Sequence, residues 1–214
     1  MKKEEDTTKK DKEKVTGSVH MSKRVTVFFA TGNIMKVEEA ERIFKEENIP
    51  LLHLPVKLME IQADDVEEIA VFSAQKTWED QEKPLFVEDA GLFIKELKGF
   101  PGPYSSYVSK TISNEGILKL MSQVEDRTAY FKAVIAFCNG KKTLTFKGEI
   151  KGEISREIRG KHGFGFDPIF IPEEGDGRTF GEMDISEKAA ISHRTRALRK
   201  FVEWVKSTDS SKFI

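Results

Sequence analysis

The chain has 214 residues and a mass of 24.4 kDa, and 33% of its residues are charged. This length is typical of about one globular domain. The near balance of 35 basic and 36 acidic residues argues against a general nucleic-acid-binding protein, which carries a basic excess. The single cysteine, Cys138, excludes an internal disulfide framework and a cysteine-based zinc cluster.

The first residues read as a tail rather than as part of the fold. Residues 1–14 are mostly charged and have no aliphatic side chain beyond Met1, and residues 17–21 resemble a cloning scar ahead of a start at Met21. We therefore expect residues 1–22 to be a disordered tail or tag, 23–207 to form the domain and 208–214 to be a C-terminal tail. Because no apolar run approaches the ~20 residues of a membrane span and no signal-peptide pattern opens the chain, we expect a cytoplasmic protein.

The first half of the domain alternates between strands and helices. An apolar run at 25–30 predicts a buried strand, and apolar residues at helical spacing predict a helix at 36–48 that Pro50 ends. Residues 51–54 are expected to form a second strand. A helix at 66–78 follows, with Asp64 or Asp65 as N-cap. A short strand at 85–87 then runs into the acidic segment 88–91.

The second half is dominated by a long hairpin. Two β-prone runs, 129–137 and 143–150, flank Asn139-Gly140, a strong hairpin signal. Before them we expect a loop at 99–103 and a helix at 114–121. After them come a glycine-rich loop at 160–167, a strand at 169–171 and a C-terminal helix with an apolar stripe over 197–205. Together these elements predict an α/β fold with a mixed central sheet flanked by helices.

The turn after the first strand has the composition of an anion-binding site. It consists of Thr31, Gly32, Asn33, Ile34, Met35 and Lys36. Unpaired amides at a helix N-terminus favour a phosphate, glycine permits close approach of the backbone, and a lysine adds charge. The alternative is an ordinary strand–helix turn with a surface lysine.

Acidic residues at two places can serve as ligands of a hard divalent cation. Glu88 and Asp89 are adjacent after an apolar strand, and such carboxylates repel each other unless a cation lies beside them. Glu60 ends an earlier extended segment. Mg²⁺ prefers such oxygen ligands. A solvated acidic turn and a surface glutamate are the alternatives.

Residues 163–168 combine aromatic rings with a carboxylate, as a nucleobase site would. Rings stack on bases and a carboxylate accepts from a ring N–H. The candidate residues are Phe164, Gly165, Phe166 and Asp167, with Lys188, His193 and Arg194 ahead of the last helix. The alternatives are a structural turn with buried rings, a structural histidine and a solvent-facing arginine.

The ordered set of motifs resembles the inosine triphosphate pyrophosphatase family of house-cleaning nucleoside triphosphate pyrophosphatases. The motifs are Thr-Gly-Asn-x-x-Lys, Val-Glu-Asp-x-Gly-Leu, Pro-Gly-Pro-Tyr, Phe-Gly-Phe-Asp-Pro and Ser-His-Arg, between about residues 25 and 204. The resemblance implies an elongated fold of two lobes with a cleft between them, a homodimer and a requirement for Mg²⁺. The implied reaction cleaves ITP, dITP or XTP to the monophosphate and pyrophosphate.

The resemblance also implies a role for each candidate residue. Residues 31–36 would bind phosphate with help from Lys76, which by its helix position alone reads as a solvated lysine. Asp89 would bind Mg²⁺ and accept a proton, and Glu60 and Glu88 would be further metal ligands. The base would be held by Phe164, Gly165, Phe166, Asp167, Lys188, His193 and Arg194. Ala90, beside the substrate, replaces the hydroxyl residue of many relatives, so affinity is more in doubt than reaction type.

Other functions remain open at this level. A Maf-like nucleotide pyrophosphatase has a related architecture, but Phe-Gly-Phe-Asp and Ser-His-Arg are not its motifs. A non-catalytic nucleotide-binding regulator would keep the cleft and lose Asp89 or Lys36, and neither is lost. Cys138 lies in a predicted strand and is a poor candidate for a covalent nucleophile.

Overall fold

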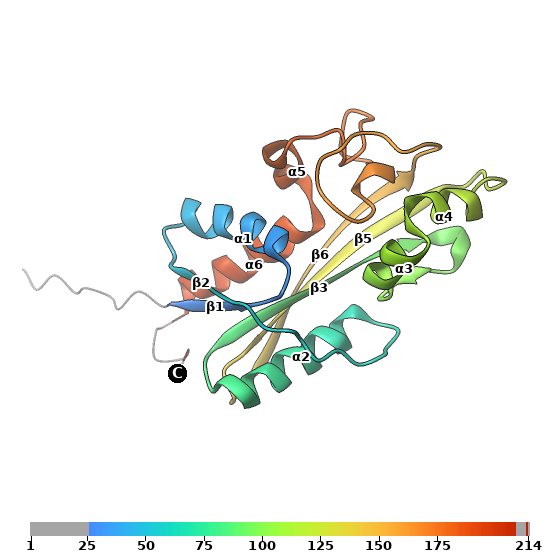
Figure 1. The fold of residues 1–214 in the computed structure, drawn as a ribbon. Coiled ribbons are helices and arrows are strands. Elements are labelled where there is room, and N and C mark those ends of the chain that lie inside the picture. Colours follow the sequence, from blue (N-terminus) through green and yellow to red (C-terminus); the bar gives the residue numbers. More distant parts are fainter. Residues whose placement is uncertain (1–25, 209–212, 214) are drawn as a thin grey trace, which may run out of the picture.

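A computed structural model describes residues 26–208 and Phe213, and its centre is one mixed sheet (Figure 1). The strand order is β2-β1-β3-β5-β6-β7, with β4 added to β3. Strand β1 pairs in parallel with β2 and β3, and the pairs from β3 to β7 are antiparallel. The predicted mixed sheet flanked by helices is confirmed. The expected tail at 1–22 lies outside the described residues.

The elements have the following bounds. The strands are β1 Val27–Ala30, β2 Leu51–Leu54, β3 Leu85–Ile94, β4 Pro101–Gly102, β5 Thr128–Cys138, β6 Thr143–Ile154 and β7 Phe170–Pro172. The helices are α1 Ile34–Glu46, α2 Val66–Gln81, α3 Ser105–Thr111, α4 Ser113–Leu120, α5 Ile185–Ile191 and α6 His193–Ser207, with short 3₁₀ turns at Lys95–Leu97 and Asp167–Ile169. None of the helices in the described part is long and apolar enough to span a bilayer.

Helices cover both faces of the sheet. Successive side chains of β3 point to opposite faces. Phe86 and Ala90 pack in the cluster beneath α1 and α6, whereas Leu85 and Val87 pack in the cluster beneath α2. A third cluster fills the far end of the sheet, where α3 and α4 lie (Figure 1). Residues 88 and 89 therefore belong to opposite faces.

The predicted strand at 85–87 is longer than expected, because β3 continues through the acidic segment 88–91. The alternative of a solvated acidic turn at 88–91 is therefore wrong. That strand pairs with β5 without a break, from Leu85 opposite Cys138 to Ile94 opposite Ala129. Adjacent carboxylates can occupy a central strand here because the cations that neutralise Glu88 come from distant parts of the chain, Lys36 and Arg194. Nothing near residue 88 in the sequence signals these partners.

Other boundaries differ in ways that local capping explains. Helix α1 begins at Ile34 rather than Lys36, because the Asn33 side chain accepts a hydrogen bond from the Met35 amide and caps the helix there. Helix α2 continues to Gln81 from its predicted N-cap, Asp65. The short helices α3 and α5 were missed, since seven residues carry too little periodicity to be recognised. The hairpin at 139–142 is confirmed.

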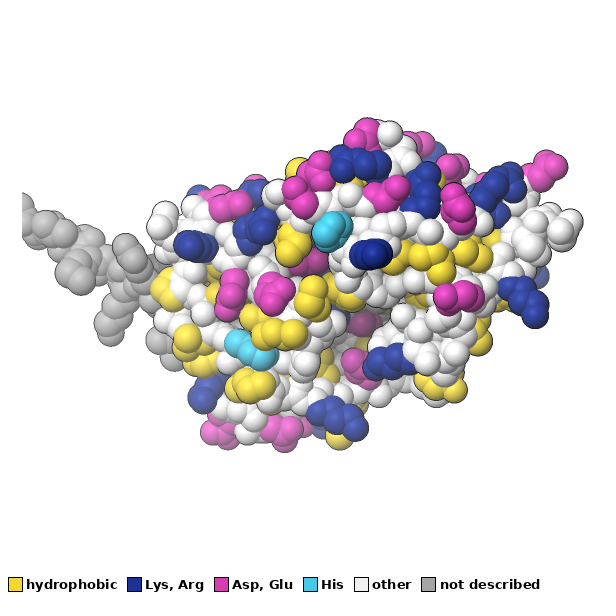
Figure 2. Space-filling view, turned by 45° about the horizontal axis from the view of Figure 1, so that its top comes forward, with side chains coloured by type: hydrophobic (Ala, Val, Ile, Leu, Met, Phe, Trp, Pro, Cys, Tyr) yellow, Lys and Arg dark blue, Asp and Glu magenta, His cyan; other side chains and the backbone are white. Residues whose placement is uncertain are grey.

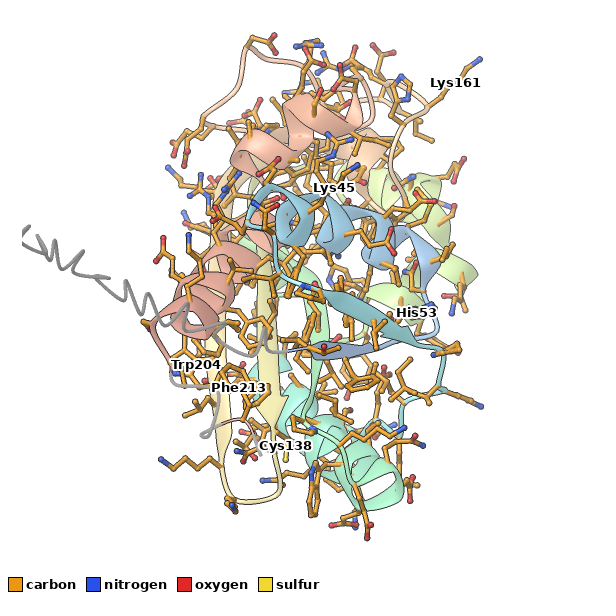
Figure 3. All side chains as sticks on the ribbon, turned by 90° about the vertical axis from the view of Figure 1, so that its left-hand side faces the viewer. Lys45, His53, Cys138, Lys161, Trp204 and Phe213 are labelled. Carbon is orange, nitrogen blue, oxygen red and sulfur yellow. The ribbon has the colours of Figure 1, made fainter. Side chains whose placement is uncertain are left out.

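The end of the chain returns to the core. Phe213, in the segment expected to be a tail, is buried and its ring lies 5.0 Å from that of Trp204 and 5.5 Å from that of Phe137 (Figure 3). Cys138, the neighbour of Phe137 in β5, is buried on the other face of the sheet beneath α2.

We expect Gly148→Ala to lower the free energy of unfolding by about 1–3 kcal/mol, the usual cost of overpacking. A methyl group at this position of β6 would lie 2.0 Å from the His193 carbonyl oxygen and 2.6 Å from the Ala197 amide nitrogen, both in the backbone of α6. Urea unfolding measures the effect. Glu149→Ala, at the exposed neighbouring position, is the control. An unchanged midpoint in Gly148→Ala would show that α6 does not rest on this glycine.

Candidate functional site

The turn between β1 and α1, the predicted anion site, is held by local hydrogen bonds at the start of a helix. The Thr31 hydroxyl accepts a hydrogen bond from the Asn33 amide at 3.1 Å, and the Asn33 side chain caps α1. The His53 ring, on edge strand β2, lies 2.9 Å from the Thr31 carbonyl oxygen and therefore donates through Nε2. These bonds fix the peptide groups at the start of a 13-residue helix, where unpaired amides and the helix dipole favour negative charge.

Lys36 extends from this turn to the middle of strand β3. Its Nζ forms an ion pair with Glu88 Oε2 at 2.6 Å and donates to the Glu88 carbonyl oxygen at 2.9 Å. The predicted phosphate lysine is thus held beside the predicted acidic pair, 52 residues away in sequence.

Both carboxylate oxygens of Glu88 face cations. Its second oxygen, Oε1, accepts from Arg194 Nε at 2.9 Å, and its side chain is 1% exposed. Burial alone would raise the pKa of Glu88, but Arg194 and Lys36 outweigh it and hold the pKa below its usual value. Because both oxygens face cations, the predicted role of Glu88 as a metal ligand has no support in this arrangement.

Asp89 has the opposite environment, on the face of the sheet that α2 covers. One oxygen, Oδ1, accepts from the Ala90 amide at 2.9 Å, whereas Oδ2 is buried and has no hydrogen-bond partner among the described residues. Burial raises the pKa of Asp89 to about 7; Lys36 opposes the rise, and the negative charges of Glu88 and Glu60 add to it.

This environment fits a divalent cation. A buried carboxylate oxygen without a partner is costly, and a cation beside Asp89 would satisfy it. Glu60 is near enough to repel the Asp89 charge and is the other available carboxylate. Within residues 26–208 and Phe213 no group of three or more His, Cys, Asp and Glu side chains forms a preassembled cage. A cation bound here would therefore take its remaining ligands from substrate and water.

The predicted base-binding residues meet beside the N-terminal half of α1, next to Glu39. Asp167 Oδ2 accepts from the Phe164 amide at 2.8 Å and from Lys188 Nζ at 2.7 Å. Lys188 Nζ and the Arg194 guanidinium carbon each lie 5.1 Å from the centre of the Phe164 ring. Phe166 instead points into the core, so only one of the two rings in the motif is available for stacking.

Gly163 is required for this arrangement. Its φ of +73° is in the left-handed region, and a Cβ atom would lie 2.1 Å from Asp167 Oδ2. The carboxylate can therefore receive the Phe164 amide only because residue 163 has no side chain.

His193 lies inside the fold near the positive charges of Arg194, Lys188 and Lys36, whereas Lys76 lies on the surface of α2. The buried His193 ring stacks on Phe131 with centroids 4.6 Å apart, and burial keeps its pKa well below the usual value. Lys76 Nζ bonds Glu79 Oε2 at 2.7 Å on the surface of α2. Ala90 contributes its amide to Asp89 and packs its methyl against the core beneath α1 and α6. The roles given to these residues stay predictions.

Sequence reasoning missed Glu39. Its Oε2 accepts from Arg194 at 2.6 Å and its Oε1 from Lys188 at 3.0 Å, so it joins α1 to the two base-site cations. Burial alone would raise the pKa of Glu39, but Arg194 and Lys188 lower it to about 2. The position three residues after Lys36, on the same face of a predicted helix, is the signal that would have found it.

Two hollows adjoin the site. One is small and lies between the start of α1, residues 162–163 and α5, and Glu39 and Lys188 are part of its lining. The other is larger and lies between residues 56–59 and the C-terminal half of α2, where Lys76 is. Figure 2 shows acidic and basic side chains interspersed over one face of the molecule, in agreement with the balanced net charge.

Comparison with known proteins identifies the family. Residues 27–204 match the model described as the Ham1 family, so the chain belongs to the Ham1 family. The resemblance drawn from the motifs is confirmed, and the match does not favour the Maf-like alternative.

Curated relatives match almost along their whole length. A protein of Methanopyrus kandleri named "dITP/XTP pyrophosphatase" is 50% identical over 182 residues, covering 85% of this chain and 96% of the relative. A protein of Thermococcus kodakarensis with the same name is 50% identical and covers 83% and 96%. Among solved structures, a HAM1 protein from Coxiella burnetii has a TM-score of 0.77 at 30% identity, covering 86% of this chain and 100% of that one.

We expect Glu39→Gln to lower stability at pH 7 and to reduce the loss of stability in acid. A carboxylate with a folded pKa of about 2 against the usual 4.5 stabilises the fold above pH 4.5, and this contribution, about 3 kcal/mol, is lost as the pH falls from 4.5 towards 2. Urea unfolding from pH 7 to pH 3 measures the difference in free energy of unfolding between wild type and variant. This difference should become smaller in acid. Glu46→Gln, in an exposed pair with Arg199, is the control. If this difference stayed constant over the pH range, the lowered pKa of Glu39 would be contradicted.

Proposed function

We propose that this protein hydrolyses the non-standard purine nucleotides ITP, dITP and XTP to the monophosphate and pyrophosphate. The observation that carries the proposal is the Asp89 carboxylate, with a buried and unpartnered oxygen in a central strand, close to the cation that extends from an anion-binding helix terminus. The names of the relatives from Methanopyrus and Thermococcus support the choice of substrate.

In this proposal the triphosphate binds at the turn of residues 31–36. The backbone amides at the start of α1 and the Lys36 ammonium neutralise phosphate oxygens. Lys76 lies on α2, which covers the same face of the sheet as Asp89, and its exposed pair with Glu79 costs little to break. It is thereby available to the leaving pyrophosphate.

Asp89 and Glu60 would hold the metal ion, which we propose to be Mg²⁺. When bound, the ion supplies positive charge to the phosphate oxygens and a fixed position for water. The Asp89 carboxylate takes a proton from the attacking water, whose oxygen joins the α-phosphorus as the bond to the bridging oxygen breaks and pyrophosphate leaves. The unpartnered Asp89 oxygen is the carboxylate atom placed to accept this proton.

The base would lie against Phe164 with its C6 edge towards Arg194. Two nitrogens of the guanidinium donate to carboxylates, Nε to Glu88 and Nη1 to Glu39, and the third, Nη2, would face the base. This nitrogen can donate to the C6 carbonyl of hypoxanthine or xanthine but not to the C6 amino group of adenine. Asp167 keeps Oδ1 for a protonated ring nitrogen.

Assembly and location form a separate part of the proposal. The resemblance to the pyrophosphatase family supports a homodimer and a cytoplasmic enzyme. Sedimentation equilibrium tests the dimer: a molecular mass near 24.4 kDa, that of one chain, would contradict it.

We expect Asp89→Asn to reduce kcat for ITP by ~10²–10⁴-fold in the presence of Mg²⁺, since the variant keeps its shape and loses both the metal-binding charge and the proton acceptor. Release of pyrophosphate from ITP, XTP, GTP, ATP and dTTP measures activity and substrate class together. A fall below about threefold would assign the role to another residue. If the wild type bound these nucleotides and released no pyrophosphate, the protein would be a nucleotide-binding regulator.

We expect wild-type kcat/KM for ITP to exceed that for ATP by ~10⁴-fold, because ATP places an amino group against Arg194 and leaves buried polar groups unpaired. GTP shares the C6 carbonyl and should be rejected less strongly. Arg194→Lys keeps the charge that Glu88 and Glu39 require but loses the planar fork, so the ITP-to-ATP ratio should fall at least about tenfold. Equal turnover of ATP and ITP by the wild type would overturn this account of the base site.

A further inference from the structure

One unbroken series of ion pairs runs from the phosphate turn to the base loop. In spatial order its members are Lys36, Glu88, Arg194, Glu39, Lys188 and Asp167. Cations and carboxylates alternate, and each inner member contacts two neighbours of opposite charge. The distances between charged atoms are 2.6, 2.9, 2.6, 3.0 and 2.7 Å. The series is built from α1, β3, α5, α6 and the turn at Asp167–Ile169.

Glu88 is the member that connects the two halves of the site. It shares its two oxygens between Lys36, on the phosphate side, and Arg194, on the base side. Its side chain is 1% exposed and that of Arg194 is 4% exposed, so water cannot readily replace Arg194, whereas Lys36 is 16% exposed. A buried carboxylate that loses one cation must depend more strongly on the other.

We propose that Glu88 is a positioning residue that couples phosphate binding to base recognition. When phosphate oxygens draw Lys36 away, Arg194 becomes the main cation for Glu88 and is held more firmly in the orientation that presents its Nη2 to the base. Phosphate binding at Lys36 therefore strengthens the binding of a purine with a C6 carbonyl. By linkage, such a purine strengthens phosphate binding by the same factor.

This proposal rests on the function proposed above. The experiment is chosen so that failure of the coupling and failure of the proposed function give different results. The substrate is divided into two probes: inosine carries the base and ribose, and inorganic tripolyphosphate carries the phosphates. Calorimetry in Mg²⁺ buffer measures the affinity for inosine with and without saturating tripolyphosphate. For the wild type we expect tripolyphosphate to tighten inosine binding at least about fivefold, at the lower end of common coupling factors. Adenosine, without a C6 carbonyl, should show no such gain.

Two variants, one of Glu88 and one of Lys36, test whether this ion pair carries the coupling. Glu88→Gln removes the shared negative charge, so tripolyphosphate should tighten inosine binding by less than about twofold, even though both probes still bind. Lys36→Met imitates the state in which Lys36 has left Glu88. Its affinity for inosine alone should rise towards the wild-type value with tripolyphosphate, an increase that general damage to the fold would not produce. Thermal unfolding checks that both variants are folded.

Glu173→Gln is the matched control, because it removes one carboxylate from an exposed pair with Lys151 outside the series and should keep the wild-type gain. If Glu88→Gln does not fold, the Lys36→Met measurement decides alone. Independent binding of the two probes in the wild type, or unchanged inosine affinity in Lys36→Met, would overturn the coupling while leaving the proposed function intact. Failure of the wild type to hydrolyse ITP would overturn the proposed function itself.

Discussion

The arrangement of the site depends on the neutralisation of one buried carboxylate. Glu88 lies in the centre of the sheet, where an unpaired charge would cost several kcal/mol. Lys36 and Arg194 neutralise it from two different helices, and the same contacts fix where α1 and the start of α6 lie relative to β3. The buried charge of Glu88 thus positions Lys36 and Arg194, the two cations that the proposed chemistry requires.

The alternation of strand β3 separates two kinds of carboxylate chemistry. Glu88 points to the face under α1 and α6, where cations keep it ionised, whereas Asp89 belongs to the face under α2, where burial and other negative charges raise its pKa to about 7. Two residues of similar chemistry, adjacent in sequence, therefore have different surroundings. In the mechanism that we propose, Glu88 positions other residues, and Asp89 binds a cation and accepts a proton.

Much of the fold followed from local sequence patterns. The alternation of strands and helices, the Asn139-Gly140 hairpin and the apolar stripe of the last helix were predicted because each is a short-range property of the chain. The motif residues at 31–36, 88–89, 164–167 and 188–194 were also identified from sequence order. What could not be predicted was β3 passing through the acidic segment, because its stabilising cations are 52 and 106 residues away.

The sequence by itself determined the family, the class of reaction and the residue types available to the site, since these depend on which side chains occur and in what order. Only the tertiary structure decided how they are paired. It placed Glu88 between two cations, directed Phe166 into the core and brought in Glu39, which no motif had singled out. The physical reason is that a charge or a ring acquires its role from its neighbours in space, and sheet pairing and helix packing bring those neighbours from distant segments.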